Sequence, residues 1–108
     1  MENISFNDFK KMDVRVGKVL EVEDHPDADK LYVMSVDIGG ETRKMVAGVK
    51  PWYAKEDLVG RNVVVLVNLE PKEIRGVESR GMVLASLSGD DLAILTIDRD
   101  LPAGSPVS

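Results

Sequence analysis

The stretch from residue 68 to residue 82 carries side chains suited to holding a phosphate backbone. Its charged and hydrogen-bonding candidates are Asn68, Lys72, Arg75, Ser79 and Arg80. Gly76 and Gly81 lack a Cβ, so the main-chain amides beside them can approach an anion closely. Loops on a rigid scaffold commonly carry binding functions. The stretch therefore indicates a site for an anionic polymer.

The only histidine, His25, lies among Asp24, Asp27 and Asp29 in a loop that also contains Pro26. This cluster could bind a metal ion, although its spacing lacks the alternating acids, central glycine and distal glutamate of a calcium-binding loop. The alternative is a turn in which aspartate side chains accept hydrogen bonds from the backbone. We favour the turn, and we expect neither a metal ion nor another cofactor.

Groups for covalent catalysis are scarce. The chain has no Cys, and its one histidine lies in the acidic loop described above. It also lacks the G-x-S-x-G turn that presents a catalytic serine and the glycine-rich patterns that hold the phosphates of a nucleotide. We therefore expect a binding protein rather than an enzyme.

The charge distribution is more informative than the net charge of −5, which on average repels phosphate. Residues 42–61 hold five bases against two acids, and the bases of the 68–82 stretch follow them. Chance variation on a solvated surface would give a similar pattern. The further candidate ligands for phosphate are Lys30, Arg43, Lys44 and Lys50.

The length of 108 residues, 44% of them hydrophobic, is expected to form one domain, residues 1–108. No apolar run approaches the roughly 20 residues that cross a bilayer. The first residues lack the basic and apolar parts of a signal peptide. We therefore expect a cytoplasmic protein that acts away from membranes.

Hydrophobic periodicity predicts strands over most of the chain, with two short helices. Ser5 is a suitable N-cap for a helix that ends near Met12. A long strand follows, and Gly17 with an out-of-phase Val19 predicts a bulge or bend within it. The expected inner-face residues of this strand are Val14, Val16, Leu20 and Val22.

Further strands are expected at residues 31–38, 42–47, 62–69, 82–87 and 92–97. Pro51 is expected to open a short helix that ends before Gly60, and residues 70–81 are expected to form a polar loop. Five core strands with a helix between the third and the fourth follow the order of an OB-fold, a five-stranded Greek-key barrel. The prediction is thus an all-β protein with a short N-terminal helix and C-terminal extension strands, although the pattern alone leaves other small barrels open.

Three segments resemble a known family. They are Asp13-Val-Arg-Val-Gly17, His25-Pro-Asp-Ala-Asp-Lys-Leu31, and Asn68-Leu-Glu-Pro-Lys72 running on to Met82. They resemble the tRNA-binding domains found as free-standing proteins, as the C-terminal domain or β-subunit of methionyl-tRNA synthetase, and in endothelial monocyte-activating polypeptide. The resemblance covers about residues 8–88 and implies an OB-fold that binds tRNA. It also implies an RNA-binding edge, matched here at Asn68, Leu69, Pro71, Gly76, Ser79 and Met82.

Two acids depart from the family pattern within that edge. Glu70 and Glu73 stand where many members carry a base, so each removes a phosphate partner and adds repulsion. The neighbouring bases Lys72 and Arg75 could compensate. We therefore expect weak, salt-sensitive binding of structured tRNA.

Aromatic side chains offer no strong stacking platform for bases. Phe6 and Phe9 lie three residues apart on the predicted N-terminal helix, where packing is their expected role. Trp52 and Tyr53 lie beside two lysines, where they could stack on bases or plug the end of the barrel. We therefore expect recognition of RNA shape and backbone rather than of a base sequence.

The tail, residues 89–108, exceeds what a five-stranded barrel needs and contains several apolar residues. In free-standing relatives the tail builds a twofold homodimer together with the N-terminal segment, so the resemblance implies a second copy as partner. The alternative is a tail that covers only its own barrel. The absence of an attached catalytic domain suggests a free-standing protein, which could still act in trans as a subunit of methionyl-tRNA synthetase.

Two other functions stay open. The CsaA-type secretion chaperones are a related branch with the same fold and a tail similar to Leu101-Pro-Ala-Gly104, and the acidic composition favours such a protein-binding module. The second is a purely structural dimerisation domain whose RNA edge has decayed through Glu70 and Glu73. The intact 25–31 and 79–82 elements favour tRNA, which we take as the expected ligand.

Overall fold

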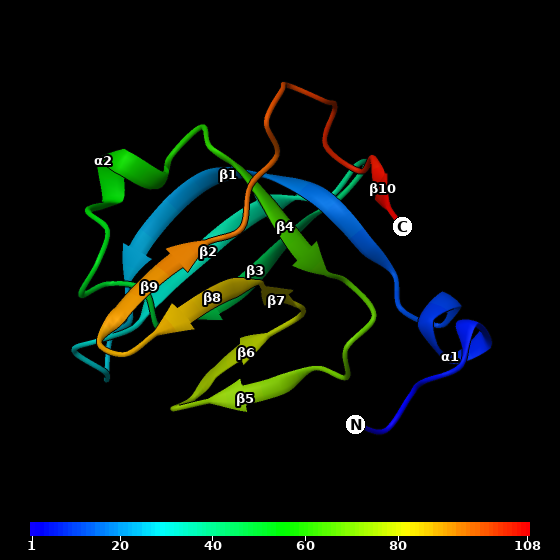
Figure 1. Cartoon of the computed structure of the whole chain (residues 1–108). Helices are drawn as coiled ribbons and strands as arrows, with labels where there is room; N and C mark the ends of the chain where they lie inside the picture. Colours follow the sequence, from blue (N-terminus) through cyan, green and yellow to red (C-terminus); the bar gives the residue numbers. More distant parts are fainter.

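The long strand β1 (Val14–Asp24) organises the fold because it pairs with a different neighbour along each half. Its first half pairs antiparallel with β4 (Asn62–Leu66), and its second half pairs antiparallel with β2 (Tyr32–Asp37). The β1–β2 register shifts between Val19 and Glu21, which marks a bulge. The computed structural model describes every residue of the chain. In it, β1 curves across the whole molecule (Figure 1). The bent first strand predicted from the sequence is confirmed.

The sheet continues on both sides of this strand and nearly closes into a barrel. β2 pairs with β3 (Thr42–Ala47), and β4 pairs with β7 (Met82–Val83), so the strand order is β3-β2-β1-β4-β7. The main-chain N–H of Arg80 donates to the carbonyl of Lys44 at 2.9 Å and helps to join the two outer edges. Helix α2 (Lys55–Leu58) lies between β3 and β4 in the chain. This is the all-β, OB-like barrel that was predicted, with its helix in the expected interval.

The barrel interior is filled by side chains from its main strands and from α2. The largest side chains with less than 2% exposure are Met34, Ile38, Met45, Leu58, Val16, Val19, Val36, Val63 and Val65. Tyr53 packs against this core: its hydroxyl accepts from the N–H of Ile94 at 3.0 Å, and its carbonyl accepts from the hydroxyl of Tyr32 at 2.8 Å. Burial of this apolar surface is the main contribution to stability.

Two predicted details of these elements are wrong. Leu20 is 44% exposed whereas Val19 is fully buried, because the bulge turns Leu20 out of the inner face that strict alternation assigned to it. The helix does not begin at Pro51, which lies instead in a turn closed by two hydrogen bonds to the carbonyl of Val49. The helix α2 starts only at Lys55.

The segment predicted as a polar loop at residues 70–81 is instead largely a β-hairpin of β5 (Lys72–Ile74) and β6 (Val77–Ser79). The favoured two-residue hairpin turn needs positive φ at both central positions. Arg75 (φ 52°) and Gly76 (φ 89°) supply them. The signal was missed because the first position holds Arg rather than Asn, Asp or Gly.

A second hairpin, β8 (Ala85–Ser88) with β9 (Asp91–Ile94), stands beside the barrel sheet. The strand predicted at 82–87 is divided into β7 and β8, and β9 ends earlier than predicted. Likewise, β4 ends at Leu66 rather than continuing to residue 69.

Both chain ends lie near the start of β1. β10 (Pro106–Val107) pairs with the first residues of β1, so the tail covers part of its own barrel. Helix α1 (Phe6–Lys10) is capped by Ser5, whose Oγ accepts from the N–H of Asp8 at 3.0 Å, as predicted. Figure 1 shows α1 and both termini on one side of the barrel, and the tips of the β5–β6 and β8–β9 hairpins on the other. Neither helix is long and apolar enough to cross a membrane.

Candidate nucleic-acid interface

His25 ties the β5–β6 hairpin to the loop between β1 and β2. Its ring is buried, and Nδ1 accepts a hydrogen bond from the main-chain N–H of Asp27 at 2.9 Å. Nε2 therefore carries the ring proton and donates it to the carbonyl of Ile74 in β5, also at 2.9 Å. In the opposite direction, Nη2 of Arg75 donates to the carbonyl of Asp27 at 2.9 Å. Two hydrogen bonds thus dock the hairpin on this loop.

The acidic loop around His25 is built as a turn, and its aspartates do not converge on a common centre. No group of three or more His, Cys, Asp or Glu side chains is placed to hold a metal ion. Asp24 accepts instead from Nζ of Lys50 at 3.0 Å and of Lys55 at 3.1 Å. These hydrogen bonds, first from Lys50 and then from Lys55, lower the pKa of Asp24. Lys50, predicted as a phosphate ligand, is therefore already paired within the protein.

Ser79 helps to close the barrel. Its side chain is only 5% exposed, and its Oγ accepts from the main-chain N–H of Val46 at 3.0 Å. The same hydroxyl donates to the carbonyl of Gly81 at 3.2 Å. The bond to Val46 joins β6 to β3, which share no strand ladder. The hydroxyl predicted to meet RNA is thus engaged inside the protein.

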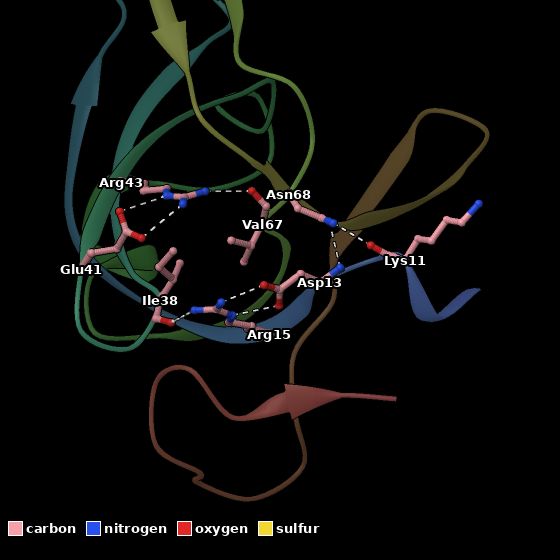
Figure 2. A network of polar contacts seen from close by, with 8 residues as sticks. All are labelled: Lys11, Asp13, Arg15, Ile38, Glu41, Arg43, Val67 and Asn68. Atoms are coloured by element: carbon pink, nitrogen blue, oxygen red, sulfur yellow. Dashed lines mark hydrogen bonds and ion pairs between the residues drawn. The ribbon is translucent and has the colours of Figure 1, made fainter. Parts of the chain in front are cut away.

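Asn68 holds the N-terminal segment against the end of β4. Its Oδ1 accepts from the N–H of Asp13 at 2.8 Å, and its Nδ2 donates to the carbonyl of Lys11 at 2.6 Å. Figure 2 shows the amide lying between these two main-chain groups. Both polar atoms of this predicted ligand therefore have protein partners.

Arg43 is also committed to the protein. Its Nη1 donates to the carbonyl of Val67 at 2.8 Å, and its Nε and Nη2 both donate to the carboxylate of Glu41 at 3.2 Å (Figure 2). The side chain of Arg43 is 17% exposed. Its hydrogen bonds lower the pKa of Glu41. Little of this guanidinium is left for a phosphate.

The same region contains a two-point ion pair at the start of β1. Nε and Nη2 of Arg15 donate to the carboxylate of Asp13 at 2.9 and 2.7 Å, and Nη1 donates to the carbonyl of Ile38 at 3.1 Å (Figure 2). This hydrogen bonding lowers the pKa of Asp13 and raises the pKa of Arg15. The Asp13–Gly17 segment therefore contributes to the fold at this end of the barrel.

The remaining predicted bases are exposed, and none of them forms an ion pair with a carboxylate. They are Lys30, Lys44, Lys72, Arg75 and Arg80. Arg75 donates one N–H of its guanidinium to the carbonyl of Asp27, and its other N–H groups are left for a ligand. The last predicted ligand, Met82, is 46% exposed. The ten predicted residues thus separate into four committed side chains and six that face solvent.

Three hollows border the β5–β6 hairpin. Lys44 and Arg80 line a shallow groove between β3 and β6, which also receives Glu78. Lys72 and Met82 line a smaller pocket, whose other walls are Val46, Leu69, Glu70, Ile74, Ser79 and Gly81. Arg75 stands at the tip of the hairpin, where it shares a third hollow with Lys30. The hairpin is therefore surrounded by basic side chains that form no ion pair, with acidic side chains interspersed among them.

The sequence did not reveal the hairpin itself, although it did indicate that the main chain beside Gly76, which lines the groove, can approach an anion. It also left two roles open for Trp52 and Tyr53, stacking on nucleobases or plugging the end of the barrel, and the structure places the two residues differently. Tyr53 packs on the core, whereas Trp52 is 39% exposed, with its indole N–H donating to the carbonyl of Asp90 at 3.0 Å. Nearest-neighbour patterns in an irregular turn could not have distinguished them.

Comparison with known proteins gives closely similar relatives over the whole chain. The methionine–tRNA ligases of Pyrococcus furiosus and Thermococcus onnurineus are 52% and 50% identical over 107 residues, which is 99% of this chain. That of Thermotoga maritima is 46% identical over 105 residues. The chain spans only 15%, 15% and 17% of the length of these three relatives, respectively.

Solved structures give the same fold. A MetRS-related protein from Pyrococcus horikoshii superposes with a TM-score of 0.93 at 32% identity and covers both chains completely. The chaperone CsaA from Bacillus anthracis str. Ames superposes with a TM-score of 0.90 at 29% identity over 99% of this chain and all of that one. A family model described as "Putative tRNA binding domain" matches residues 14–106. The chain therefore belongs to the tRNA-binding domain family.

Proposed function

We propose that this protein binds structured tRNA without catalysing a reaction on it, through the β5–β6 hairpin and the facing part of β3. The observation that carries the proposal is that basic side chains without an ion-pair partner gather around this hairpin, although the chain has a net charge of −5. Lys44, Lys72, Arg75 and Arg80 would meet phosphates, and Met82 would contact the ribose or a base edge. No cofactor is needed for such binding.

The proposed contacts are few, and acids stand among them. With about four phosphate contacts, affinity should fall roughly 50- to 150-fold between 50 and 200 mM salt. Because most of the contacts are to phosphates, the shape of the RNA rather than its sequence would decide where the domain binds. With tRNA as its ligand, the domain would act in the cytoplasm.

The decisive experiment is a titration of fluorescently labelled tRNA, followed by anisotropy at low and at physiological salt. Lys44→Ala/Arg80→Ala should weaken binding and make its salt dependence shallower by about two contacts. Lys11→Ala/Arg99→Ala removes the same charge outside the hairpin and serves as the matched control. If the two double variants weaken tRNA binding equally, the proposed binding surface is wrong.

We further propose that two copies pair through their chain ends. An apolar hollow there is lined by Phe6, Phe9, Met12 and Val107, and Phe6 is 70% exposed. A twofold pair would present two hairpins to one tRNA and raise the apparent affinity without new contacts.

The similarity to methionine–tRNA ligases supports a role in delivering tRNA to a methionyl-tRNA synthetase, either within one polypeptide or in trans. The similarity to CsaA supports one alternative, the binding of unfolded protein. A parallel titration of a fluorescently labelled unfolded polypeptide separates the two. Binding of the polypeptide without any tRNA binding would favour the chaperone, and binding of neither would favour a purely structural domain.

A further inference from the structure

Trp52 is a partly exposed aromatic residue held against the tip of the β8–β9 hairpin. Its side chain is 39% exposed, and its indole N–H donates to the carbonyl of Asp90 at 3.0 Å. Because this bond satisfies the one polar atom of the ring, the exposed part of the indole is apolar and leaves no hydrogen bond unmet. A surface of this kind suits a stacking partner.

The surroundings of Trp52 form an apolar groove with a polar rim. Leu31, Pro51 and Leu87 line the groove, and Lys30 and Asp90 stand at its edge. Leu87 is 70% exposed although it is fully apolar. Apolar walls beside an aromatic face favour a flat occupant with its charge outside the groove.

Lys30 joins this groove to the proposed RNA surface. Lys30 and Leu31 line both the Trp52 groove and the hollow that contains Arg75. Figure 1 shows the β1–β2 loop and the tips of both hairpins at the same end of the barrel. An RNA strand whose phosphates meet Arg75 and Lys30 would therefore bring its next nucleotide to Trp52.

We propose that Trp52 receives one unpaired base of the bound RNA, an inference that rests on the proposed tRNA-binding function. A base within a duplex is already stacked on its neighbours, whereas an unpaired base of a loop is free to stack on an aromatic ring. The carboxylate of Asp90 would repel a phosphate at the rim, so the base enters and Lys30 meets the flanking phosphate. The site would make the domain prefer RNA with exposed loops over a plain duplex.

Trp52 is the only tryptophan of the chain, so its fluorescence reports on this groove alone. The full chain is titrated with labelled tRNA, and two signals are recorded: the anisotropy of the tRNA and the fluorescence of Trp52. We expect a stacked base to quench Trp52 and the quenching to saturate at the same tRNA concentration as the anisotropy. A fully paired RNA duplex of similar mass should change the anisotropy without quenching.

Variants test the energetic contribution. Trp52→Ala should weaken tRNA binding about 5- to 150-fold, the range that base stacking spans in alanine substitutions. Trp52→Phe should retain most of the affinity, since a phenyl ring also stacks. If Trp52→Ala is unfolded at the temperature of the titration, Trp52→Phe serves as the test variant in its place. Leu101→Ala, an exposed apolar position in the C-terminal tail, should bind as wild type.

The outcomes separate the two proposals. An unchanged anisotropy would overturn both tRNA binding and the base site. A changed anisotropy without quenching, with Trp52→Ala binding as wild type, would overturn the base site and leave tRNA binding standing. Quenching by an unfolded polypeptide but not by tRNA would assign the groove to a protein ligand instead.

Discussion

Glu73 and Glu78 stand directly opposite each other across the β5–β6 hairpin, so two like charges face each other in register. Such a pair destabilises a hairpin, and it also opposes the approach of phosphate. Glu73→Lys should stabilise the domain by about 0.2–1 kcal/mol, because the pair becomes attractive. It should also raise tRNA affinity, and Glu70→Lys should add to that gain. Melting temperature and tRNA anisotropy are the measurements, with Glu56→Lys in α2 as the charge-matched control.

His25→Ala should loosen the β5–β6 hairpin without removing any basic side chain from the proposed RNA interface. The substitution deletes the bond to Ile74 and the acceptor of the Asp27 amide, at a cost of about 1–3 kcal/mol. Hydrogen exchange should become faster in β5 and β6 while β1 and β4 stay protected, and tRNA affinity should fall. Uniformly faster exchange over the barrel would show that His25 supports the whole fold instead.

Ser79→Ala and Met82→Ala should separate two roles that the family resemblance joins. Ser79→Ala leaves the amide of Val46 without its partner and should destabilise the domain by about 1–3 kcal/mol. Well below its melting temperature, that variant should still bind tRNA. Met82→Ala removes an exposed side chain, so it should change affinity more than stability. The reverse pattern would return Ser79 to the RNA surface.

Acid should destabilise the domain through Asp13. Its hydrogen bonds from Arg15 lower its pKa below the ordinary value of 3.8. The pair therefore contributes stability above that value, and the contribution is lost as the pH falls through the lower folded-state pKa. Asp24 and Glu41 act in the same direction. Urea unfolding from pH 7 down to pH 3 should show a smaller acid-induced loss for Asp13→Asn, which is already less stable at neutral pH.

The proposed dimer makes a prediction about mass. Light scattering should give twice the chain mass for the wild type and the single-chain mass for Phe6→Asp, because the carboxylate would be placed in the apolar hollow at the chain ends. Leu87→Asp introduces the same charge at an equally exposed apolar position at the other end of the barrel, so it should leave the mass doubled. A wild-type protein that is already monomeric would rule the dimer out.

The barrel was predictable because its signals are local. The alternation in β1, the β-branched run of β4 and the Ser5 cap each lie within a few residues of sequence. The β5–β6 hairpin was not predictable, because Arg75 is a non-glycine residue at φ 52°. Its conformation is supported by the bond to Asp27, 48 residues away in the chain.

The site was predictable in position but not in detail. Side-chain type identified Asn68 and Arg43 as polar candidates, but their partners lie up to 57 and 24 residues away, respectively. Whether an arginine faces a phosphate or a carbonyl depends on these long-range contacts, which pattern cannot supply. Lys44, Lys72 and Arg80 are exposed and form no ion pair, although Glu70 and Glu78 line the same hollows.

The meeting of α1 and β10 at one side of the barrel has a consequence for how the domain can be joined to other proteins. Phe6 and Val107 line the same hollow, so the two ends of the chain are neighbours in space. A linker attached at either end would leave from the side away from the hairpin tips (Figure 1). A circular permutant in which a linker joins the two original termini, or a fusion at either terminus, should therefore leave the surface around the β5–β6 hairpin free.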